Sequence, residues 1–194
     1  GYLSVSASRL LPNYEFVGIE QYLRLWESER FRVALTNMAV FGGLFIGGAM
    51  GIGLLLAVLL DQKIRAEGVL RTVYLYPMAL SFIVTGTAWK WILNPGLGLE
   101  NVMHRWGFES FTFDWLVNPD RAIYCVALAG VWQSAGFVMA LFLAGLRGVD
   151  DSIIKAAQVD GASLPRIYWR IVLPCLRPVF FSTLMIVSHL AIKS

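Results

Sequence analysis

The stretch ALTNMAVFGGLFIGGAMGIGLLLAVLL, residues 34–60, contains no charged side chain and decides the fold class of this protein. An α-helix rises about 1.5 Å per residue, and roughly 20 apolar residues cross the hydrocarbon core of a bilayer. The stretch is longer than that minimum. We therefore expect it to form a transmembrane helix.

Three glycines within this stretch, Gly43, Gly47 and Gly51, recur at a spacing of four residues. This spacing places them on one face of a helix, where a neighbouring helix can approach closely. The alternative is that they reflect only the general abundance of glycine in membrane helices.

Three further apolar runs follow, at residues 72–93, 122–146 and 173–193. Over all 194 residues the mean hydropathy is +0.63 and 15% of the side chains are charged, against about 25% in soluble domains. The sequence therefore predicts an all-α, polytopic transmembrane helix bundle with four spans. The first residues after Gly1 contain no recognisable signal peptide, and the fourth run stops next to Ser194 without a polar tail. We therefore expect the bundle to be truncated at both ends.

Two polar segments separate the later spans. Residues 94–121, rich in Gly, Asn, Pro and aromatic side chains, predict a folded loop outside the membrane. Residues 61–72 and 147–172 carry seven cations in 38 residues, whereas residues 1–33 and 94–121 carry six in 61. By the positive-inside rule, this bias favours a cytoplasmic location for residues 147–172.

The compact polar block KAAQVDGASLPRIYWRIVLP, residues 155–174, interrupts two apolar runs. Asp151 or Ser152 can cap a short helix that ends at Gly161, and Ser163 can cap a second helix with Pro165 in its first turn. The small residues around the turn suit a docking surface for another protein. The alternative is an interfacial helix whose arginines and Trp169 lie among lipid headgroups.

The segment KAAQVDGASLPRIYWRIVLPCLRP resembles the cytoplasmic signature loop of bacterial ABC importer permeases, which runs Glu-Ala-Ala, three residues, Gly, and ends in Leu-Pro. The segments FVGIEQYLRLW, LRTVYLYPMALSFIVTGTAWKWILNPGLGLEN and GVWQSAGFVMALFLAGL also look like the carbohydrate-uptake permeases of the maltose-transporter type. Within that type, the likeness is to the glucose or mannose permeases of pseudomonad-type bacteria.

The resemblance implies that residues 152–170 form a coupling helix region in a cleft of a cytoplasmic ATPase subunit. The residues that match the signature, and that we expect to contact the ATPase, are Ala156, Ala157, Asp160, Gly161 and Ala162. Lys155 replaces the usual leading Glu, so a salt bridge made by that Glu cannot be carried over. The family has six core spans and this chain four, so we expect no transport by this polypeptide alone.

Further partners follow from the same resemblance. It implies an ATPase subunit dimer, a second and different permease subunit, a periplasmic sugar-binding protein, surrounding membrane lipid and a location in the bacterial inner membrane. It does not specify which sugar is carried.

Polar side chains at membrane depth are costly and are therefore candidates for the substrate path. Gln133, Ser134 and Phe137 lie within about one helical turn, and Ser81 and Thr85 align four residues apart. The alternative is that the hydroxyls bond their own helix and Gln133 bonds a neighbouring one. The resembled family also draws its sugar site from the spans on both sides of the signature loop, which adds Ser188 and His189.

Several other functions are not favoured. No basic run suggests nucleic acid, and no cluster of side chains suggests a catalytic centre, a metal site or a cofactor. The motif G-x-x-x-x-G-K-[ST] is absent, so we expect ATP hydrolysis in a partner and no enzyme activity here. An ion-gradient-driven secondary transporter is the alternative, but the four spans contain no Asp or Glu.

Overall fold

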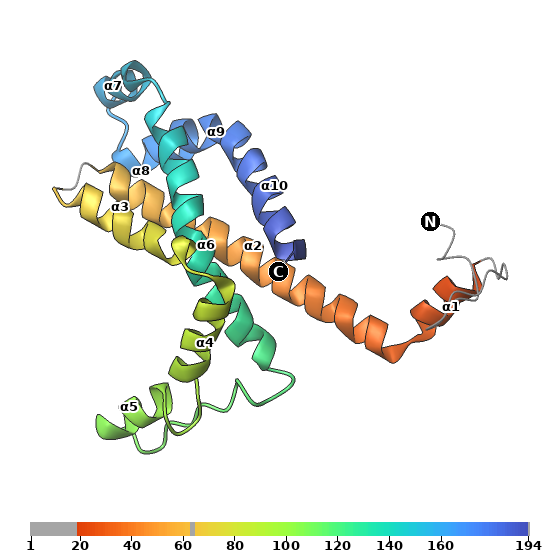
Figure 1. Ribbon diagram of the computed structural model, residues 1–194. Helices are drawn as coiled ribbons and strands as arrows, with labels where there is room; N and C mark the ends of the chain where they lie inside the picture. Colours follow the sequence, from red (N-terminus) through yellow and green to blue (C-terminus); the bar gives the residue numbers. More distant parts are fainter. Residues whose placement is uncertain (1–18, 63–64, 194) are drawn as a thin grey trace. The chain divides into compact units, whose positions relative to one another are not determined.

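A computed structural model describes residues 19–62 and 65–193, and no strand occurs among them (Figure 1). The chain divides into two compact units, Gly1–Val40 and Phe41–Ser194. Two features of the sequence, residues 16–18 of the first family-like segment and the cation Lys63, lie outside the described residues.

The first unit contains helix α1 (Glu20–Glu27) and the start of helix α2 (Glu29–Asp61). Arg24 and Glu20 form an ion pair of 2.6 Å along the exposed surface of α1. Side-chain pairs at this four-residue spacing add little stability when they face solvent.

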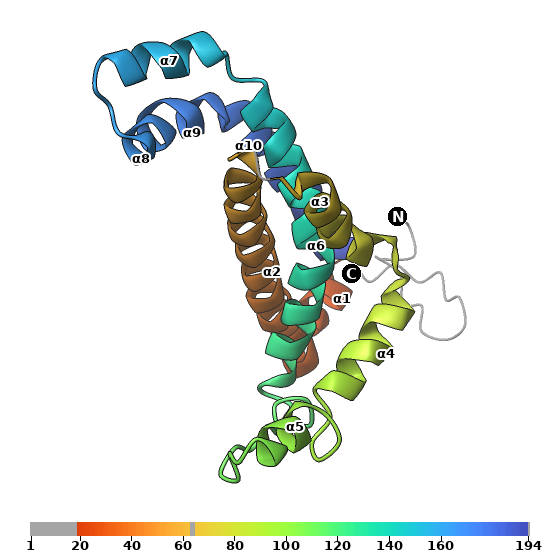
Figure 2. The ribbon, with the colours of Figure 1, turned by 90° about the vertical axis from the view of Figure 1, so that its left-hand side faces the viewer.

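The second unit holds the remaining described helices, arranged around α6 (Figure 2). They are α3 (Glu67–Leu75), the 3₁₀ turn η2 (Tyr76–Ala79), α4 (Phe82–Ile92), α5 (Leu99–Arg105), α6 (Ala122–Arg147), α7 (Asp151–Val159), α8 (Leu164–Ile167), the π-helix η3 (Tyr168–Val172), α9 (Leu173–Cys175) and α10 (Arg177–Lys193). Val138, Met139, Phe142 and Leu143 of α6 are almost fully buried, so this helix supplies the centre of the core.

Glycines let α6 approach its neighbours closely. Gly130 lies against the ring of Phe45, and Gly145 lies against Leu176 and Val179. At Gly136 an added Cβ would overlap the carbonyl oxygen of Tyr74, so the backbones of α3 and α6 are in direct contact. Close backbone approach through small residues is a common way to pack helices in membranes.

The close packing expected at Gly43, Gly47 and Gly51 does not occur within the second unit, where all three face open space. The prediction was wrong for these helices because α2 turns a different face toward α6. That face presents Gly48 to Val131 and Gly53 to Val138.

Two of the four expected spans are single helices, α2 and α6, and the other two are broken. The expected span 72–93 begins earlier, at Glu67, and bends by 101° before α4. Pro77 lacks an N–H, and Leu80 and Ser81 are extended, with ψ of 143° at both residues. The expected span 173–193 is broken after Cys175: the segment Leu164–Cys175 meets α10 at 66°, and α10 begins at Arg177 with Pro178 in its first turn.

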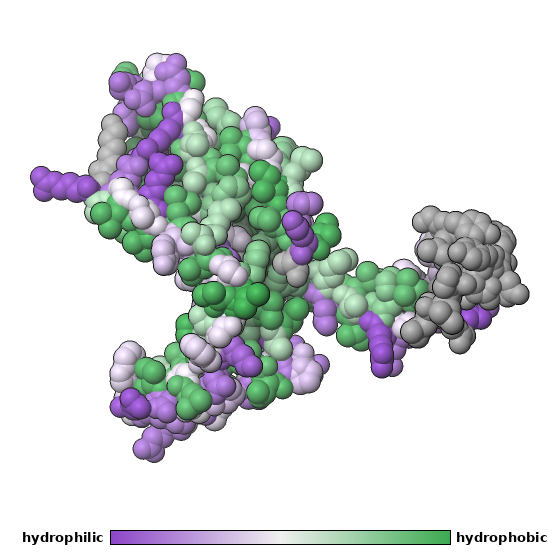
Figure 3. All heavy atoms as spheres, in the orientation of Figure 1, coloured by the Kyte–Doolittle hydropathy of each residue, from purple (hydrophilic) through white to green (hydrophobic). Residues whose placement is uncertain are grey.

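Residues 61–62 and 65–72 meet segment 147–172 at one end of the second unit. The Tyr168 hydroxyl donates a hydrogen bond to Asp61, and Arg147 forms an ion pair with Glu67. In Figure 3 hydrophilic side chains gather around α7 at this end and around α5 at the other, with a largely hydrophobic surface between them. This distribution agrees with a membrane-spanning unit whose two polar ends face opposite sides.

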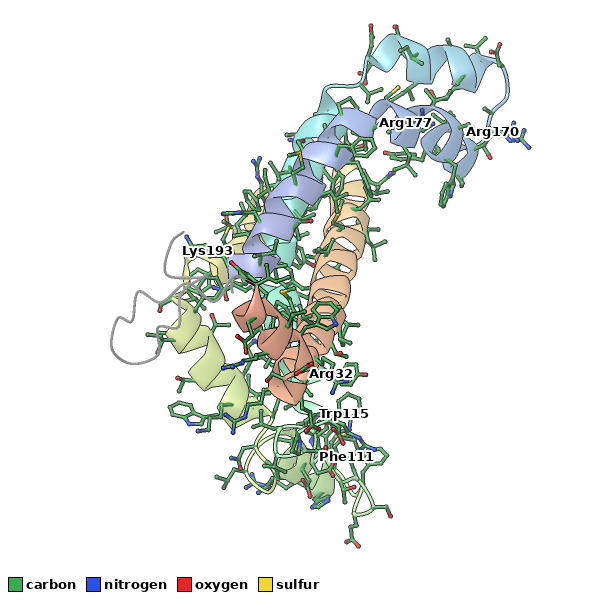
Figure 4. The ribbon with its side chains drawn as sticks, turned by 90° about the vertical axis from the view of Figure 1, so that its right-hand side faces the viewer. Arg32, Phe111, Trp115, Arg170, Arg177 and Lys193 are labelled. Carbon is green, nitrogen blue, oxygen red and sulfur yellow. The ribbon has the colours of Figure 1, made fainter. Side chains whose placement is uncertain are left out.

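The segment 94–121 is folded, as expected. Three of its aromatic side chains form a row in which Phe111 stacks on Phe113 and Phe113 on Trp115, and Trp115 meets Tyr124 of α6 edge-on. Two hydrogen bonds connect the residues of this row to α5. One joins His104 Nε2 and the Phe111 carbonyl, and the other runs from the Phe113 N–H to Glu100. Figure 4 shows Phe111 and Trp115 together at the opposite end of the unit from Arg170.

The Gly136→Ala substitution is expected to destabilise the second unit strongly, by about 2 kcal/mol or more, because the new methyl group cannot fit against the Tyr74 carbonyl. The measurement is thermal unfolding of the detergent-purified protein. Gly47→Ala is the matched control, since its methyl group meets no atom within 4 Å. Equal stability of both variants would contradict the direct backbone contact.

Candidate functional sites

The first candidate site is the helical hairpin of α7 and α8. Asp150 begins α7 as its N-cap, and its carboxylate accepts a hydrogen bond of 2.8 Å from the Ser152 N–H. The cap is therefore Asp150, and the expected Asp151 and Ser152 lie in the first turn. The Ser152 backbone N–H, followed by its hydroxyl, lowers the pKa of Asp150, because both hydrogen bonds favour the charged carboxylate that caps the helix.

The turn after α7 has the geometry expected from Gly161, whose φ is +77°. The N–H of Ala162 donates to the Ala157 carbonyl, and the N–H of Gly161 donates to that of Gln158, each at 3.0 Å. This pair of bonds is a Schellman motif, which ends a helix sharply and favours glycine at the left-handed position. Ser163 lies at the N-cap position of α8, as expected, but its side chain makes no capping hydrogen bond, and Pro165 lies in the first turn.

The five signature residues of this hairpin have different exposures. Ala156, Asp160 and Gly161 are exposed, and Ala162 is half-buried. Ala157 is buried and belongs to the core cluster, so it holds α7 against the rest of the unit and is not free to touch a partner from this position. Lys155, which replaces the family's Glu, is exposed.

Exposed apolar side chains on the hairpin were not identified from the sequence. Val159 is 88% exposed, and Leu164 and Ile153 are about half exposed. An isolated exposed apolar residue is ordinary, but Val159 and Leu164 flank one tight turn, while Ile153 lies in the first turn of α7. The signal that could have found Val159 is its position directly before the Asp-Gly that ends α7.

The second candidate site surrounds the break in the α3–α4 pair. The buried amide of Gln133 donates a hydrogen bond of 2.9 Å from Nε2 to the carbonyl oxygen of Leu80. Leu80 lies between η2 and α4, where no helical N–H continues the ladder. Since lipid offers no replacement partner, a side chain of another helix satisfies this carbonyl. The bond matches the alternative that Gln133 bonds a neighbouring helix.

Two small cavities meet at Gln133 and Ser134. The larger, of about 200 Å³, is lined also by Thr85, Phe82 and Phe45. Phe137 lines the smaller cavity, of about 170 Å³. The Thr85 hydroxyl is buried in the first cavity wall and has no hydrogen-bond partner among the described residues. The cavities therefore combine aromatic rings with an amide and hydroxyls.

The remaining predicted path residues lie elsewhere. The hydroxyl of Ser81 caps α4 by accepting a hydrogen bond from the Ile83 N–H, and its side chain is exposed. On α10, Leu190 lines both cavities, while Ser188 is half-buried and His189 exposed outside their walls. A path role for Ser81, Ser188 and His189 stays a prediction.

A third cavity, of about 550 Å³, is almost wholly apolar. Two tryptophans, Trp89 and Trp132, line this cavity and meet each other edge-on. They are therefore separate from the walls that contain Gln133 and Ser134.

Similarity to known proteins shows to which family of proteins this chain belongs. The profile of the family described as "Binding-protein-dependent transport system inner membrane component" matches residues 35–194. This chain belongs to that family.

Two curated relatives come from Pyrococcus horikoshii and Haloferax volcanii. The Pyrococcus protein, "Probable ABC transporter permease protein PH1215", is 37% identical over 100% of this chain and 67% of its own length. The Haloferax protein, "Xylose/arabinose import permease protein XacH", is 39% identical over 94% of this chain and 57% of its own length. The chain therefore spans about three-fifths of the relatives it matches.

The fold is also that of a known transporter. A bacterial ABC transporter involved in the import of the acidic polysaccharide alginate aligns with a TM-score of 0.79 and 24% identity, covering 89% of this chain and 60% of the other. The helical bundle predicted from the sequence is thereby confirmed as the fold of such a transporter.

The Gln133→Met substitution tests the bond at the helix break. It keeps the side-chain length but leaves the Leu80 carbonyl unsatisfied, which is expected to cost about 1–3 kcal/mol. Amide hydrogen exchange of residues 80–86 should become faster, whereas the exposed Gln158→Met control should change nothing there. Unchanged exchange in both variants would show that the bond does not hold the break.

Proposed function

We propose that this chain forms part of the permease subunit of an ATP-driven carbohydrate importer, contributing to the translocation path and coupling it to a cytoplasmic ATPase. The observation that carries the proposal is the family match over residues 35–194. The printed name of the Haloferax relative, a xylose/arabinose import permease, supports a sugar substrate. The match gives no support to an ion-gradient-driven transporter.

The proposed partners are an ATPase subunit dimer, a second and different permease subunit, and a binding protein that delivers the sugar. The family description names binding-protein dependence, and a related alginate transporter structure contains a periplasmic protein bound to an alginate pentasaccharide. The proposed location is the cytoplasmic membrane. A bacterial origin stays a prediction, because the Pyrococcus and Haloferax relatives are archaeal. A glucose or mannose substrate also stays a prediction.

The ATPase is proposed to dock on the α7–α8 hairpin. The hairpin lies at the predicted cytoplasmic end, its turn is fixed by Gly161, and Ala156 and Asp160 are exposed beside it. Exposed Val159 and Leu164 supply apolar surface that a cleft can bury. Buried Ala157 is proposed to support the hairpin from behind.

The Val159→Asp substitution is expected to abolish co-purification of the ATPase encoded in the same operon, because it places a charge in the proposed contact. Val117→Asp is the matched control, since Val117 is 67% exposed in the loop at the opposite end. Both variants are first checked for membrane insertion. Recovery of the ATPase with Val159→Asp, or its loss with both variants, would count against docking here and favour the interfacial-helix alternative.

The sugar is proposed to pass Gln133, Ser134, Phe137 and Thr85. Hydroxyls and amides pair with sugar hydroxyl groups, and aromatic faces stack on sugar C–H groups. The unpartnered Thr85 hydroxyl supports this proposal, because a buried hydroxyl without a partner costs free energy that a polar ligand can recover. A buried polar group kept in a cavity wall is therefore suited to a passing ligand.

The Thr85→Val substitution tests this path. Valine has nearly the same shape, so the unfolding temperature is expected to stay equal or rise while the KM for sugar uptake by the assembled importer increases severalfold. Thr183→Val is the matched control, because the Thr183 hydroxyl is also buried without a described partner but lines neither cavity. Unchanged uptake by the Thr85 variant would remove Thr85 from the path.

A further inference from the structure

We call residues 164–175, which lead from the hairpin turn to α10, the arm. It contains a π-helix, η3, between α8 and α9. π-Helical turns are rare, and they occur frequently at functional sites. Ile167, directly before this turn, and Val172, its last residue, are 1% and 2% exposed and belong to the same core cluster as Leu60 of α2. The arm is therefore packed onto the unit by its apolar side chains.

Tyr168, the first residue of the π-helix, adds a polar connection to α2. Its hydroxyl donates a hydrogen bond of 2.6 Å to Asp61 Oδ2, and Gln62 Nε2 donates one of 3.2 Å to the same hydroxyl. Asp61 is the last residue of α2. Among the described residues of segment 150–172, only Tyr168 has a side chain hydrogen-bonded to a residue of another span.

The two kinds of contact hold the arm differently. Apolar contacts such as those of Ile167 are non-directional, so they do not by themselves specify how the arm is placed against the end of α2. A hydrogen bond to a carboxylate is directional and strong, so it fixes one position of the arm against the end of α2. Tyr168 lies seven residues after Gly161, and the short helix α8 fills most of that interval.

Several connections lead from the hairpin into the bundle. Along the chain, α7 follows α6 directly, and α8 continues through η3 and α9 to α10. A further connection crosses from Tyr168 to Asp61 and reaches α2, which is 107 residues away in sequence. The chain itself joins the hairpin to α6 and α10, whereas this hydrogen bond joins it to α2.

We propose that Tyr168 is a positioning residue whose hydrogen bond to Asp61 transmits movement of the hairpin to α2, so that ATP-driven motion reaches both α10 and α2. This inference rests on the proposed function, because it takes the hairpin as the place where the ATPase acts. The Tyr168→Phe substitution removes only the hydroxyl and keeps the ring that packs in the arm.

The experiment uses the complete importer, assembled from full-length subunits in lipid vesicles, and measures sugar uptake and ATP hydrolysis together. With Tyr168→Phe the ATPase should remain bound and continue to hydrolyse ATP, while the number of sugars imported per ATP falls by roughly tenfold, the effect of losing a hydrogen bond to a charged group. Tyr76→Phe is the matched control, because Tyr76 is exposed and its hydroxyl has no hydrogen bond among the described residues.

A second pair of variants separates coupling from folding. Asp61→Ala should lower the same ratio, and the double variant with Tyr168→Phe should be no worse than either single one, because both remove one bond. An unchanged ratio with Tyr168→Phe, additive effects in the double variant, or an equal fall of uptake and hydrolysis would overturn this inference alone. Failure of the unmodified importer to take up sugar would overturn the proposed function, and the inference with it.

Discussion

The second unit depends on the close contact between α6 and the broken helix pair α3–α4. Gly136 admits the Tyr74 carbonyl to the surface of α6, and one turn earlier Gln133 satisfies the Leu80 carbonyl. In a medium without water, a broken helix persists only where another part of the protein supplies the missing hydrogen bonds. The small residue and the amide on one helix therefore make the break possible.

The break also determines where polar groups can lie. It turns α4 away from α3 by 101°. Phe82 then lines both cavities together with Gln133 and Ser134, and Thr85 lines the larger one. The amide of Gln133 has a double role, because it holds the break and forms part of the cavity wall. Replacing Gln133 therefore tests stability and transport at once, whereas Thr85 separates them.

The proposed coupling end, the α7–α8 hairpin, also depends on a few specific contacts. The hairpin is fixed internally by its Asp150 cap and the Schellman turn, so it can move as one piece. Its attachment to the spans is apolar at Ala157 and Ile167 and polar at Tyr168. An ATP-driven importer needs such a division, because a docking element must be rigid in itself and connected directionally to the helices that it moves.

The resemblance of the signature loop predicted the family to which the chain belongs. Local sequence rules predicted the turn at Gly161 and the folded loop 94–121. These features could be read from the sequence because they depend on neighbouring residues, such as the glycine that alone suits φ of +77°. The cap was misassigned by one residue, since Asp150, Asp151 and Ser152 all have suitable side chains.

The sequence by itself determined that this is a membrane protein and how many apolar segments it has, because the cost of burying polar groups in lipid is encoded in composition. Only the tertiary structure decided which glycines pack, that the second span breaks at Leu80, that Ala157 faces inward and that Tyr168 reaches Asp61. Each of these depends on how helices far apart in sequence rotate against one another, and helical periodicity alone does not specify which face meets which neighbour.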